Sequence, residues 1–207
     1  MQRLIVTLLS FLICTHTHAG LTAPQLNESM RRSIAVEEDI TITETRDSME
    51  KANIGMTDKN RKEVGKILNV LLSDVFLIYV KTLNYHWNVR GIVFHDFHAL
   101  FKEQYEQLLD TSDEIAERAR ALGSPAFGTM AEFLKYTQLK EEPGIIPSAK
   151  EMIQNLLSDH EAFIQKIRSV LQPLNDEYGD FGTNNFLTEI MERHEKTAWM
   201  LRATLEK

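Results

Sequence analysis

The chain has 207 residues, of which 43% are hydrophobic and 26% charged, a balance typical of one water-soluble globular domain with a possible appendage. Its 23 basic and 30 acidic residues give a net charge of −7, which argues against binding nucleic acid or anionic membranes through bulk charge. Its single cysteine, Cys14, excludes an intrachain disulfide framework and any zinc site built from several cysteines.

Residues 1–20 are not expected to belong to the fold. A basic residue near the start is followed by an apolar run at 4–13 and by Thr17-His18-Ala19, which resembles a small-x-small cleavage site. This pattern predicts a secretory signal peptide, because a run of ten residues is too short for a membrane span of roughly 20. The alternative is a start codon assigned too early, since Met30 and Met49 also precede the patterned region.

Residues 21–53 form a second stretch outside the expected core. They are mostly polar, lack sustained periodicity, and hold four basic and seven acidic residues, a net charge of −3. This composition predicts a mobile polar arm. The folded domain is therefore expected over residues 54–207.

Four long segments carry apolar residues at steps of three and four, which predicts amphipathic helices. No segment shows the period of two that is typical of a strand. Between the second and third segments lies a long link, 123–146, in which 130–139 is apolar enough for a short helix lying across the others. The sequence therefore predicts an all-α four-helix bundle with a short extra helix in the link. The four segments are 57–89, 94–122, 147–173 (opened by a capping box from Ser148 to Glu151) and the stretch after Gly179.

Histidines and carboxylates gather in the first two helical segments. His86 closes the first helix, His98 opens the second, and Asp113 and Glu117 lie four apart on one face of the second. Imidazoles combined with carboxylates suit iron, manganese or zinc. The alternatives are a histidine that only caps a helix end and a carboxylate pair that only forms a solvated face.

The length of the second helix constrains any such site. His98 and Asp113 are fifteen residues apart, about 22 Å along a straight helix, so they cannot bind the same ion within one chain. Fifteen residues also return nearly to the same face. If these residues are ligands, two antiparallel copies of this helix around a twofold axis near Glu106 would bring His98 of one copy to Asp113 and Glu117 of the other.

The order of these residues resembles a known family. HWNVRG at 86–91, FHDFHALFKEQYEQLLDTSDEIAERARALG at 94–123 and HEKTAWMLR at 194–202 are similar to Dps, the mini-ferritins named as DNA-binding proteins from starved cells. The resemblance covers roughly residues 54–207. It implies a ferritin-like fold and a dodecameric hollow shell in the cytoplasm. It also implies oxidation of Fe(II), preferably with hydrogen peroxide, and storage of the ferric mineral.

The resemblance further implies which residues hold iron. The family's ligands fall on His86 and His98 of one subunit and on Asp113 and Glu117 of its twofold partner, in agreement with the helix-length argument. Trp87 falls on the aromatic residue beside that site, and simple interface packing is its alternative role.

One position departs from the family. Four residues after His98 the family carries Asp or Glu, whereas this chain has Lys102. An ammonium group has no lone pair and repels a second cation. We therefore expect a site that binds one iron better than two and oxidises it slowly. The alternative is a shell whose interface chemistry has decayed, leaving iron sequestration or assembly alone.

Other polar residues have separate expectations. Neither His160 nor His194 has a Glu three residues earlier, as the di-iron centre inside a ferritin bundle requires, so both are expected to form interhelical hydrogen bonds. His95 is expected near the surface. Asp176 and Asp180 match the region where the family lines ion-entry pores, and helix capping by Asp180 is the alternative.

Binding to DNA is not expected, although some family members bind it through basic tails. The arm at 21–53 is acidic, and Lys207 is the only basic residue at the C-terminal end of the last helix. Neutralising phosphates requires clustered cations.

Overall fold

The computed structural model describes residues 49–206. The signal-peptide region with Cys14 and most of the predicted arm lie outside the described residues. Within 49–206 the chain forms helices and connections and no strand, so the all-α prediction is confirmed. The helices are α2 (Asp58–Asn88), α3 (Phe94–Ala121), α4 (Met130–Tyr136), α5 (Ala149–Asp176) and α6 (Phe181–Leu205).

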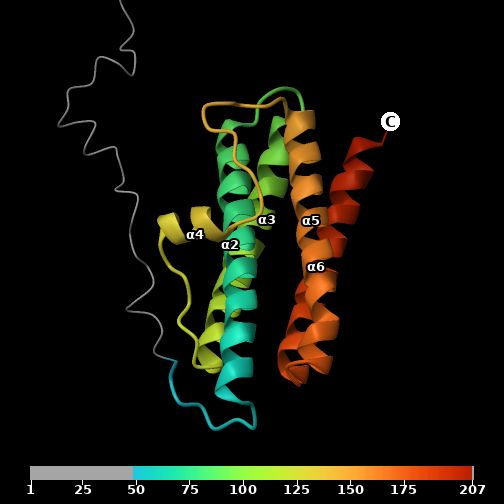
Figure 1. The fold of residues 1–207 in the computed structure, drawn as a ribbon. Helices are drawn as coiled ribbons and strands as arrows, with labels where there is room; N and C mark the ends of the chain where they lie inside the picture. The colour runs from blue at the N-terminus through green and yellow to red at the C-terminus, as the bar shows by residue number, and fades with distance from the viewer. Residues whose placement is uncertain (1–48, 207) are drawn as a thin grey trace, which may run out of the picture. The chain divides into compact units, whose positions relative to one another are not determined.

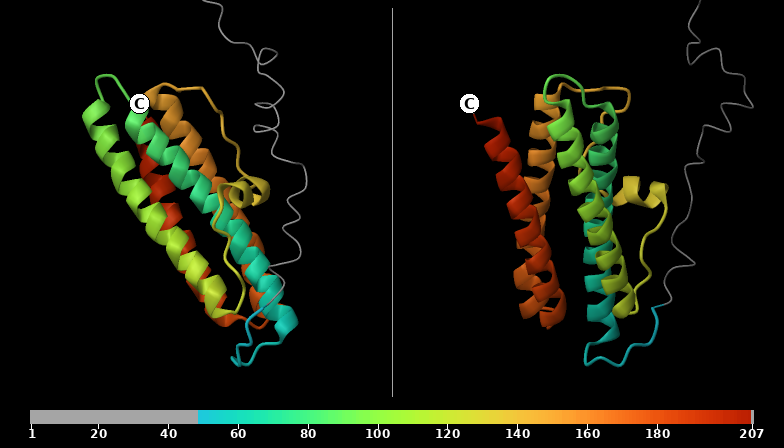
Figure 2. Two further views of the ribbon diagram at one scale, coloured as in Figure 1. Left: turned by 90° about the vertical axis from the view of Figure 1, so that its left-hand side faces the viewer. Right: turned by 180° about the vertical axis from the view of Figure 1, so that it is seen from behind.

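The four long helices form two antiparallel hairpins, α2 with α3 and α5 with α6, and α2 also packs against α5 (Figures 1 and 2). After α3 the link runs back along the bundle, so that α5 starts at the end where α2 finishes (Figure 1). This is a four-helix bundle with one long crossover. In the described part of the chain, no helix combines the length and apolarity needed to cross a membrane.

The core forms where the apolar faces of the four long helices, as predicted from the sequence, pack against one another. Each long helix contributes side chains with no exposed surface, and burying a Leu or Ile stabilises the fold by about 1.5–3 kcal/mol. Such fully buried residues include Leu68 of α2, Ile115 of α3, Leu156 of α5 and Ile190 of α6.

The short helix α4 attaches the link to α2. The Phe133 ring stacks on Phe76 with centroids 4.2 Å apart. The buried carboxylate of Asp74 accepts hydrogen bonds from Thr137 Oγ1 at 2.8 Å and from the Gln138 backbone N–H at 2.7 Å. Burial raises the pKa of Asp74, while these hydrogen bonds oppose the rise. The predicted short helix is therefore confirmed, and it ends at Tyr136 because Thr137 adopts an extended conformation.

The two ends of α5 differ in how well the sequence predicts them. The Ser148–Glu151 capping box is present, with both reciprocal hydrogen bonds. The predicted end at Pro173 is wrong, because the helix continues to Asp176. A proline removes one backbone hydrogen bond, and here the carbonyl left without a donor belongs to the exposed Ser169. Continuing the helix also buries Leu174 completely.

The C-terminal end of α3 closes in a Schellman motif. The N–H of Gly123 donates to the Arg120 carbonyl at 2.8 Å, and the N–H of Ser124 donates to the Ala119 carbonyl at 3.0 Å. This turn requires φ +79° at Gly123, in the left-handed region that favours glycine.

The last residues of the predicted arm are attached at this same turn. The N–H of Glu50 donates to the Gly123 carbonyl at 2.9 Å. The buried guanidinium of Arg61 donates to the Glu50 carbonyl at 2.9 Å and to the Leu122 carbonyl at 2.7 Å. The segment entering the bundle is therefore hydrogen-bonded to the end of α3.

We expect Gly123→Ala to destabilise the fold by about 1–3 kcal/mol. The added Cβ would lie 2.5 Å from the Glu50 carbonyl oxygen and 2.6 Å from Arg61 Nη1, in addition to the backbone strain at positive φ. Gly128→Ala is the matched control, since a Cβ there meets nothing within 4 Å. Thermal denaturation of both variants measures the difference, and equal midpoints would contradict this account of the turn.

Candidate metal site

Two histidines meet where the α2–α3 hairpin turns. His86 lies in the last turn of α2 and is buried, and His98 lies in the first turns of α3. The connection between them is short, and Gly91 adopts φ +109° within it. The structure therefore brings together the two histidines that the sequence singles out.

Each of the two imidazoles is within hydrogen-bond distance of the backbone carbonyl of the other histidine. His86 Nδ1 lies 2.7 Å from the backbone oxygen of His98, and His98 Nδ1 lies 2.8 Å from the backbone oxygen of His86. The rings stack with centroids 3.8 Å apart and planes 20° from parallel.

These contacts fix the tautomer of both rings. A carbonyl oxygen only accepts hydrogen bonds, so each Nδ1 must carry the proton. A neutral imidazole protonated at Nδ1 has its lone pair on Nε2, the form that binds a metal ion. Neither Nε2 atom takes part in a hydrogen bond within the described residues. In this tautomer both Nε2 atoms are chemically able to bind a metal ion.

Aromatic rings enclose the pair. Phe94 stacks on His98 with centroids 5.0 Å apart, and Tyr105 meets His86 edge-on at 5.2 Å. Tyr105 is not among the site residues that the sequence predicts. The available signal is its spacing of seven residues from His98, two helical turns along the same face of α3.

The structure does not bring the two predicted carboxylates to the histidines within one chain. Asp113 and Glu117 are exposed on α3, which is an unbroken helix from Phe94 to Ala121. Over residues 49–206 neither carboxylate has a hydrogen-bond or ion-pair partner. That part of the chain also contains no group of three or more His, Cys, Asp or Glu side chains able to hold a metal ion.

The carboxylates and His98 share one face of α3. This face is a stripe at steps of three and four residues, half-buried at its first residue and exposed along the rest, and it includes the apolar Leu109. Trp87, at the end of α2, is 68% exposed. Large apolar side chains left exposed beside a polar stripe are typical of an interaction surface. The stripe consists of His98, Lys102, Glu106, Leu109, Asp113 and Glu117.

Lys102 lies on this stripe one turn after His98. Its side chain is 56% exposed, and its Nζ lies 3.6 Å from Glu106 Oε1 on the next turn. Exposed ion pairs of this kind contribute little to stability. The ammonium group is therefore held weakly at the position where the resembling family carries a carboxylate.

His160 and His194 lie elsewhere, in the interior of the bundle. Their Nδ1 atoms are 2.9 Å apart across α5 and α6, so the predicted interhelical hydrogen bond is confirmed. Burial lowers the pKa of His160 to about 4 and that of His194 well below its usual value. His95 is exposed, as expected.

The two aspartates considered for a pore differ in their surroundings. Asp180 is buried and is the N-cap of α6, accepting from the Thr183 N–H at 2.8 Å and from Arg118 Nη2 at 2.9 Å. Its capping role is confirmed. Asp176 is exposed and accepts from Gln172 Nε2 at 3.2 Å. A pore role for either residue stays a prediction.

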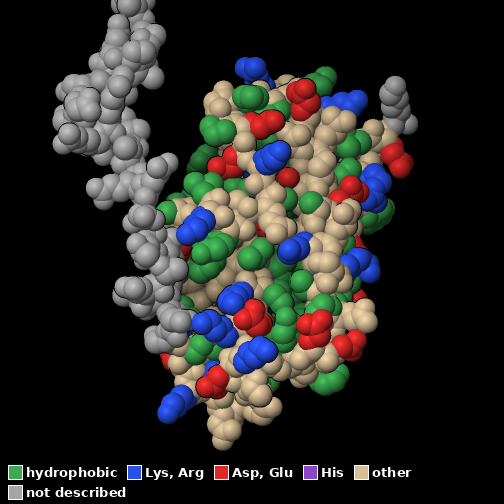
Figure 3. Space-filling model, viewed as in Figure 1, with side chains coloured by type: hydrophobic (Ala, Val, Ile, Leu, Met, Phe, Trp, Pro, Cys, Tyr) green, Lys and Arg blue, Asp and Glu red, His purple; other side chains and the backbone are tan. Residues whose placement is uncertain are grey.

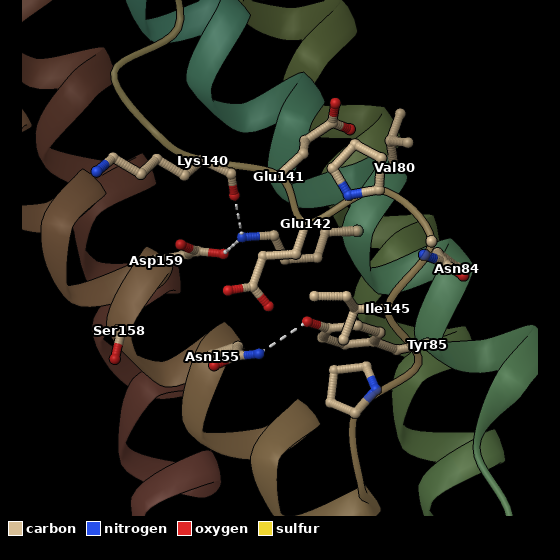
Figure 4. A pocket seen from close by; sticks show the side chains of 14 residues that line it. Val80, Asn84, Tyr85, Lys140, Glu141, Glu142, Ile145, Asn155, Ser158 and Asp159 are labelled. Atoms are coloured by element: carbon tan, nitrogen blue, oxygen red, sulfur yellow. Dashed lines mark hydrogen bonds and ion pairs between the residues drawn. The ribbon is translucent and has the colours of Figure 1, made fainter. Parts of the chain in front are cut away.

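Figure 4 shows a separate cavity of about 350 Å³ between α2, α5 and the link. Lys81 Nζ lies 2.5 Å from Asp159 Oδ2, and Asn155 donates to the Tyr85 hydroxyl at 3.0 Å. Glu142 extends its carboxylate into the cavity. Burial raises the pKa of Asp159, and the hydrogen bond from Lys81 opposes the rise. These polar groups are mostly paired internally and include no histidine, so we assign them no part in the metal site.

Comparison with known proteins gives one consistent family. The ferritin-like domain model matches residues 65–207. A low temperature-induced protein of Nostoc is 46% identical over 158 residues, covering 76% of this chain and 88% of that protein. DNA protection during starvation protein 2 of Bacillus anthracis is 32% identical over 146 residues, covering 70% and 99%.

Solved structures agree with these relatives. A DPS protein from Vibrio cholerae, described as a member of a broad superfamily of ferritin-like diiron-carboxylate proteins, is 31% identical with a TM-score of 0.71, covering 77% of this chain and 99% of that one. A Dps protein from Bacillus brevis is 32% identical with a TM-score of 0.69, covering 73% and 100%. The chain therefore belongs to the Dps family of ferritin-like proteins.

Proposed function

We propose that this protein takes Fe(II) as its substrate, oxidises it with hydrogen peroxide and stores the ferric product inside a hollow homo-oligomer, a dodecamer. Removal of both Fe(II) and peroxide would protect the cell against oxidative stress. The observation that carries the proposal is the fixed tautomer of His86 and His98, which directs two Nε2 lone pairs away from the backbone.

The iron site is completed by a second subunit in this proposal. His86 and His98 of one subunit face the partner subunit's Asp113 and Glu117 across a twofold axis. Three features of the single chain support this: the separation along α3, the unpaired carboxylates, and the exposure of most of the stripe and of Trp87, which follows His86 in the sequence. The diiron-carboxylate description of the Vibrio cholerae protein agrees with this donor set.

The chemistry balances with two iron ions for each peroxide. Each Fe(II) loses one electron and hydrogen peroxide takes up two, so 2 Fe(II), H₂O₂ and 2 H₂O give 2 FeO(OH) and 4 H⁺. The protein fixes the position of the ions, and the metal supplies the redox chemistry. Carboxylate oxygens and imidazole nitrogens stabilise the ferric product as well as the ferrous substrate.

Iron loading of the purified full-length protein tests this function. We expect a large oligomer that retains ferric iron after stepwise addition of Fe(II) and peroxide, measured by sedimentation and elemental analysis. A monomeric protein, or an oligomer that retains no iron, would contradict the proposal.

We also propose that Lys102 limits each site to one tightly bound iron. The ammonium group occupies the turn between His98 and Glu106 and cannot donate a lone pair. A site of this kind has to obtain the second electron for peroxide from an iron ion held elsewhere, which slows oxidation.

Lys102→Glu is therefore expected to speed Fe(II) oxidation by about tenfold, because it replaces a repelling charge with a ligand. Stopped-flow absorbance measures the rate, and dialysis measures whether Fe(II) per subunit rises. Lys59→Glu, the same charge reversal at an exposed position of α2, is the control. Equal oxidation rates in wild type and Lys102→Glu would contradict the proposal that Lys102 slows oxidation. Retention of iron without oxidation by the wild type would favour the alternative of a catalytically weakened shell.

Protection in this proposal does not depend on DNA binding, although the Bacillus anthracis relative is named for DNA protection. The net charge of this chain is −7. On the face shown in Figure 3, basic and acidic side chains are interspersed rather than segregated. A gel shift at low salt, where electrostatic binding is strongest, tests this expectation.

We assign the cytoplasm as the working location, with export through residues 1–20 as the alternative. The mass of the mature N-terminus distinguishes them. A start near Gly20 indicates processing of a signal peptide, and a start at Met30 or Met49 indicates synthesis without one.

A further inference from the structure

Two tyrosines lie beside the candidate metal site, one on each helix of the α2–α3 hairpin. Tyr105 lies seven residues after His98 on α3, and Tyr79 lies seven residues before His86 on α2. Seven residues are about two helical turns. Because α2 and α3 run antiparallel and pack against each other (Figure 1), the two tyrosines lie at the same level of the hairpin.

Ring contacts run without a break from His86 to Tyr79. The Tyr105 ring meets the His86 imidazole edge-on, with centroids 5.2 Å apart and planes 69° apart. Tyr79 meets Tyr105 in the same edge-on manner, with centroids 6.3 Å apart. Edge-to-face contacts at such separations are a favourable geometry for aromatic pairs. A candidate iron ligand is thus joined to two oxidisable side chains by direct ring contacts.

Tyr105 is the tyrosine whose position suits electron transfer at the site. All five tyrosines of the chain lie in the part that the structure describes. Within that part, Tyr105 is the one tyrosine whose ring contacts His86 or His98. Tyr85 precedes His86 in the sequence, but its ring contacts Phe101 instead. Contact in space therefore selects Tyr105 over the tyrosine that is nearest in sequence.

Both phenol groups can release a proton when they are oxidised. Tyr79 and Tyr105 are half-buried, and residues 49–206 supply no hydrogen-bond partner for either hydroxyl. A phenol that loses an electron also loses its hydroxyl proton, because the oxidised ring is a strong acid. The product is a neutral tyrosyl radical, so the step adds no charge to a half-buried side chain, where an unpaired charge would be costly.

Oxidation by a single iron ion creates a need for a second electron donor. Hydrogen peroxide takes up two electrons and one Fe(II) supplies one, and one-electron reduction of peroxide releases a hydroxyl radical. With Tyr105 as the second donor, Fe(II), H₂O₂ and the phenol give Fe(III), OH⁻, H₂O and the tyrosyl radical. The O–O bond breaks, Fe(II) and the phenol each lose one electron, and the phenol proton ends in the water molecule.

We propose that Tyr105 donates the second electron to peroxide when one Fe(II) is bound, and that Tyr79 is the next donor along the same path. This role rests on the proposed oxidation of Fe(II) at His86 and His98, and it identifies the group that completes the reduction. Electron transfer from Tyr79 to Tyr105 moves the radical to a ring that contacts neither histidine. A later Fe(II) reduces the radical with uptake of one proton, so two Fe(II) are consumed for each peroxide.

Freeze-quench electron paramagnetic resonance tests this role. Metal-free full-length protein is loaded with one Fe(II) per subunit and mixed with excess hydrogen peroxide. We expect wild type to form a tyrosyl radical, identified by the narrowing of its signal when ring-deuterated tyrosine is incorporated. Tyr105→Phe should lose this signal, because phenylalanine keeps the aromatic ring and removes the phenol. The matched control is Tyr136→Phe, at a half-buried tyrosine of α4 that stacks on Phe127, and it should keep the signal.

Further measurements separate electron donation from packing and from the proposed function. Tyr79→Phe should keep the signal and slow its decay, and an unchanged decay would remove Tyr79 from the path. Tyr105→Phe should bind as much Fe(II) as wild type, measured by dialysis, and release more hydroxyl radical to a spin trap in solution. Fe(II) oxidation by wild type without a tyrosyl radical, or with the same radical in Tyr105→Phe, would overturn this role and leave the proposed function standing. Absence of Fe(II) oxidation in wild type would contradict both.

Discussion

Replacing His98 with alanine is expected to slow peroxide-driven Fe(II) oxidation by more than about 100-fold. Loss of a residue that only hydrogen-bonds to a metal ligand typically reduces activity about 10- to 100-fold, and loss of a ligand itself should cost more. The change removes one of the two Nε2 donors and also the Nδ1–H that donates to the His86 carbonyl. The tautomer of His86 is unaffected directly, because its own Nδ1 bonds to the backbone oxygen of residue 98. Stopped-flow absorbance of ferric product measures the rate.

His95→Ala provides the control for this variant. His95 lies three residues earlier on α3 and is exposed, so the same substitution should leave the oxidation rate close to wild type. Glu117→Gln gives an independent check, because this carboxylate has no partner within the described chain and its loss should not affect the folding of one subunit. Wild-type oxidation by both His98→Ala and Glu117→Gln would refute the assignment of ligands.

The second large effect concerns acid stability. Burial lowers the pKa of His160 to about 4, from 6.5 in an exposed histidine. Above pH 6.5 the ring is neutral in both the folded and the unfolded chain. As the pH falls from 6.5 to about 4, the unfolded chain takes up a proton that the folded chain does not, so the free energy of unfolding falls. His160 alone should remove about 2 kcal/mol by pH 5.

Denaturant unfolding at pH 7 and pH 5, at one fixed subunit concentration, measures this loss. The fixed concentration matters because assembly itself contributes to apparent stability. His160→Gln should lose less stability over this range than wild type, since glutamine does not titrate. His95→Gln should behave as wild type. A wild-type protein equally stable at both pH values would contradict the burial of a neutral histidine pair.

The two histidine pairs differ in what their Nδ1 atoms hydrogen-bond to, and therefore in which Nε2 atoms carry lone pairs. His86 and His98 each donate Nδ1–H to a backbone carbonyl, so both Nε2 lone pairs are available together. His160 and His194 share one proton between their Nδ1 atoms, so only one ring at a time has an Nε2 lone pair. The first arrangement suits a ligand pair, whereas the second joins α5 to α6 inside the bundle.

Local periodicity predicts the helices because each helix buries one stripe of side chains. The capping box at Ser148 predicts the start of α5 for a similar reason, since both of its partners lie within one turn. The end of α5 is not predictable in this way. Pro173 favours termination locally, but the burial of Leu174 in the core extends the helix, and that burial depends on distant helices.

The candidate site is predictable in part. If His98, Asp113 and Glu117 are ligands of one ion, their spacing along α3 requires two subunits, because the helical rise separates them too far within one chain. The fixed tautomer of the histidines is not visible in the sequence, since it depends on where two backbone carbonyls lie after the hairpin closes.

Mixed oligomers test the central claim, a site shared between two subunits, most directly. His98→Ala and Glu117→Ala subunits carrying different tags are co-expressed and purified through both tags. Each variant alone should be inactive. In randomly mixed twofold dimers, half contain one subunit of each kind, and each of these has one intact site of two, so about a quarter of wild-type activity should return. Mixed oligomers no more active than either parent would contradict a shared site.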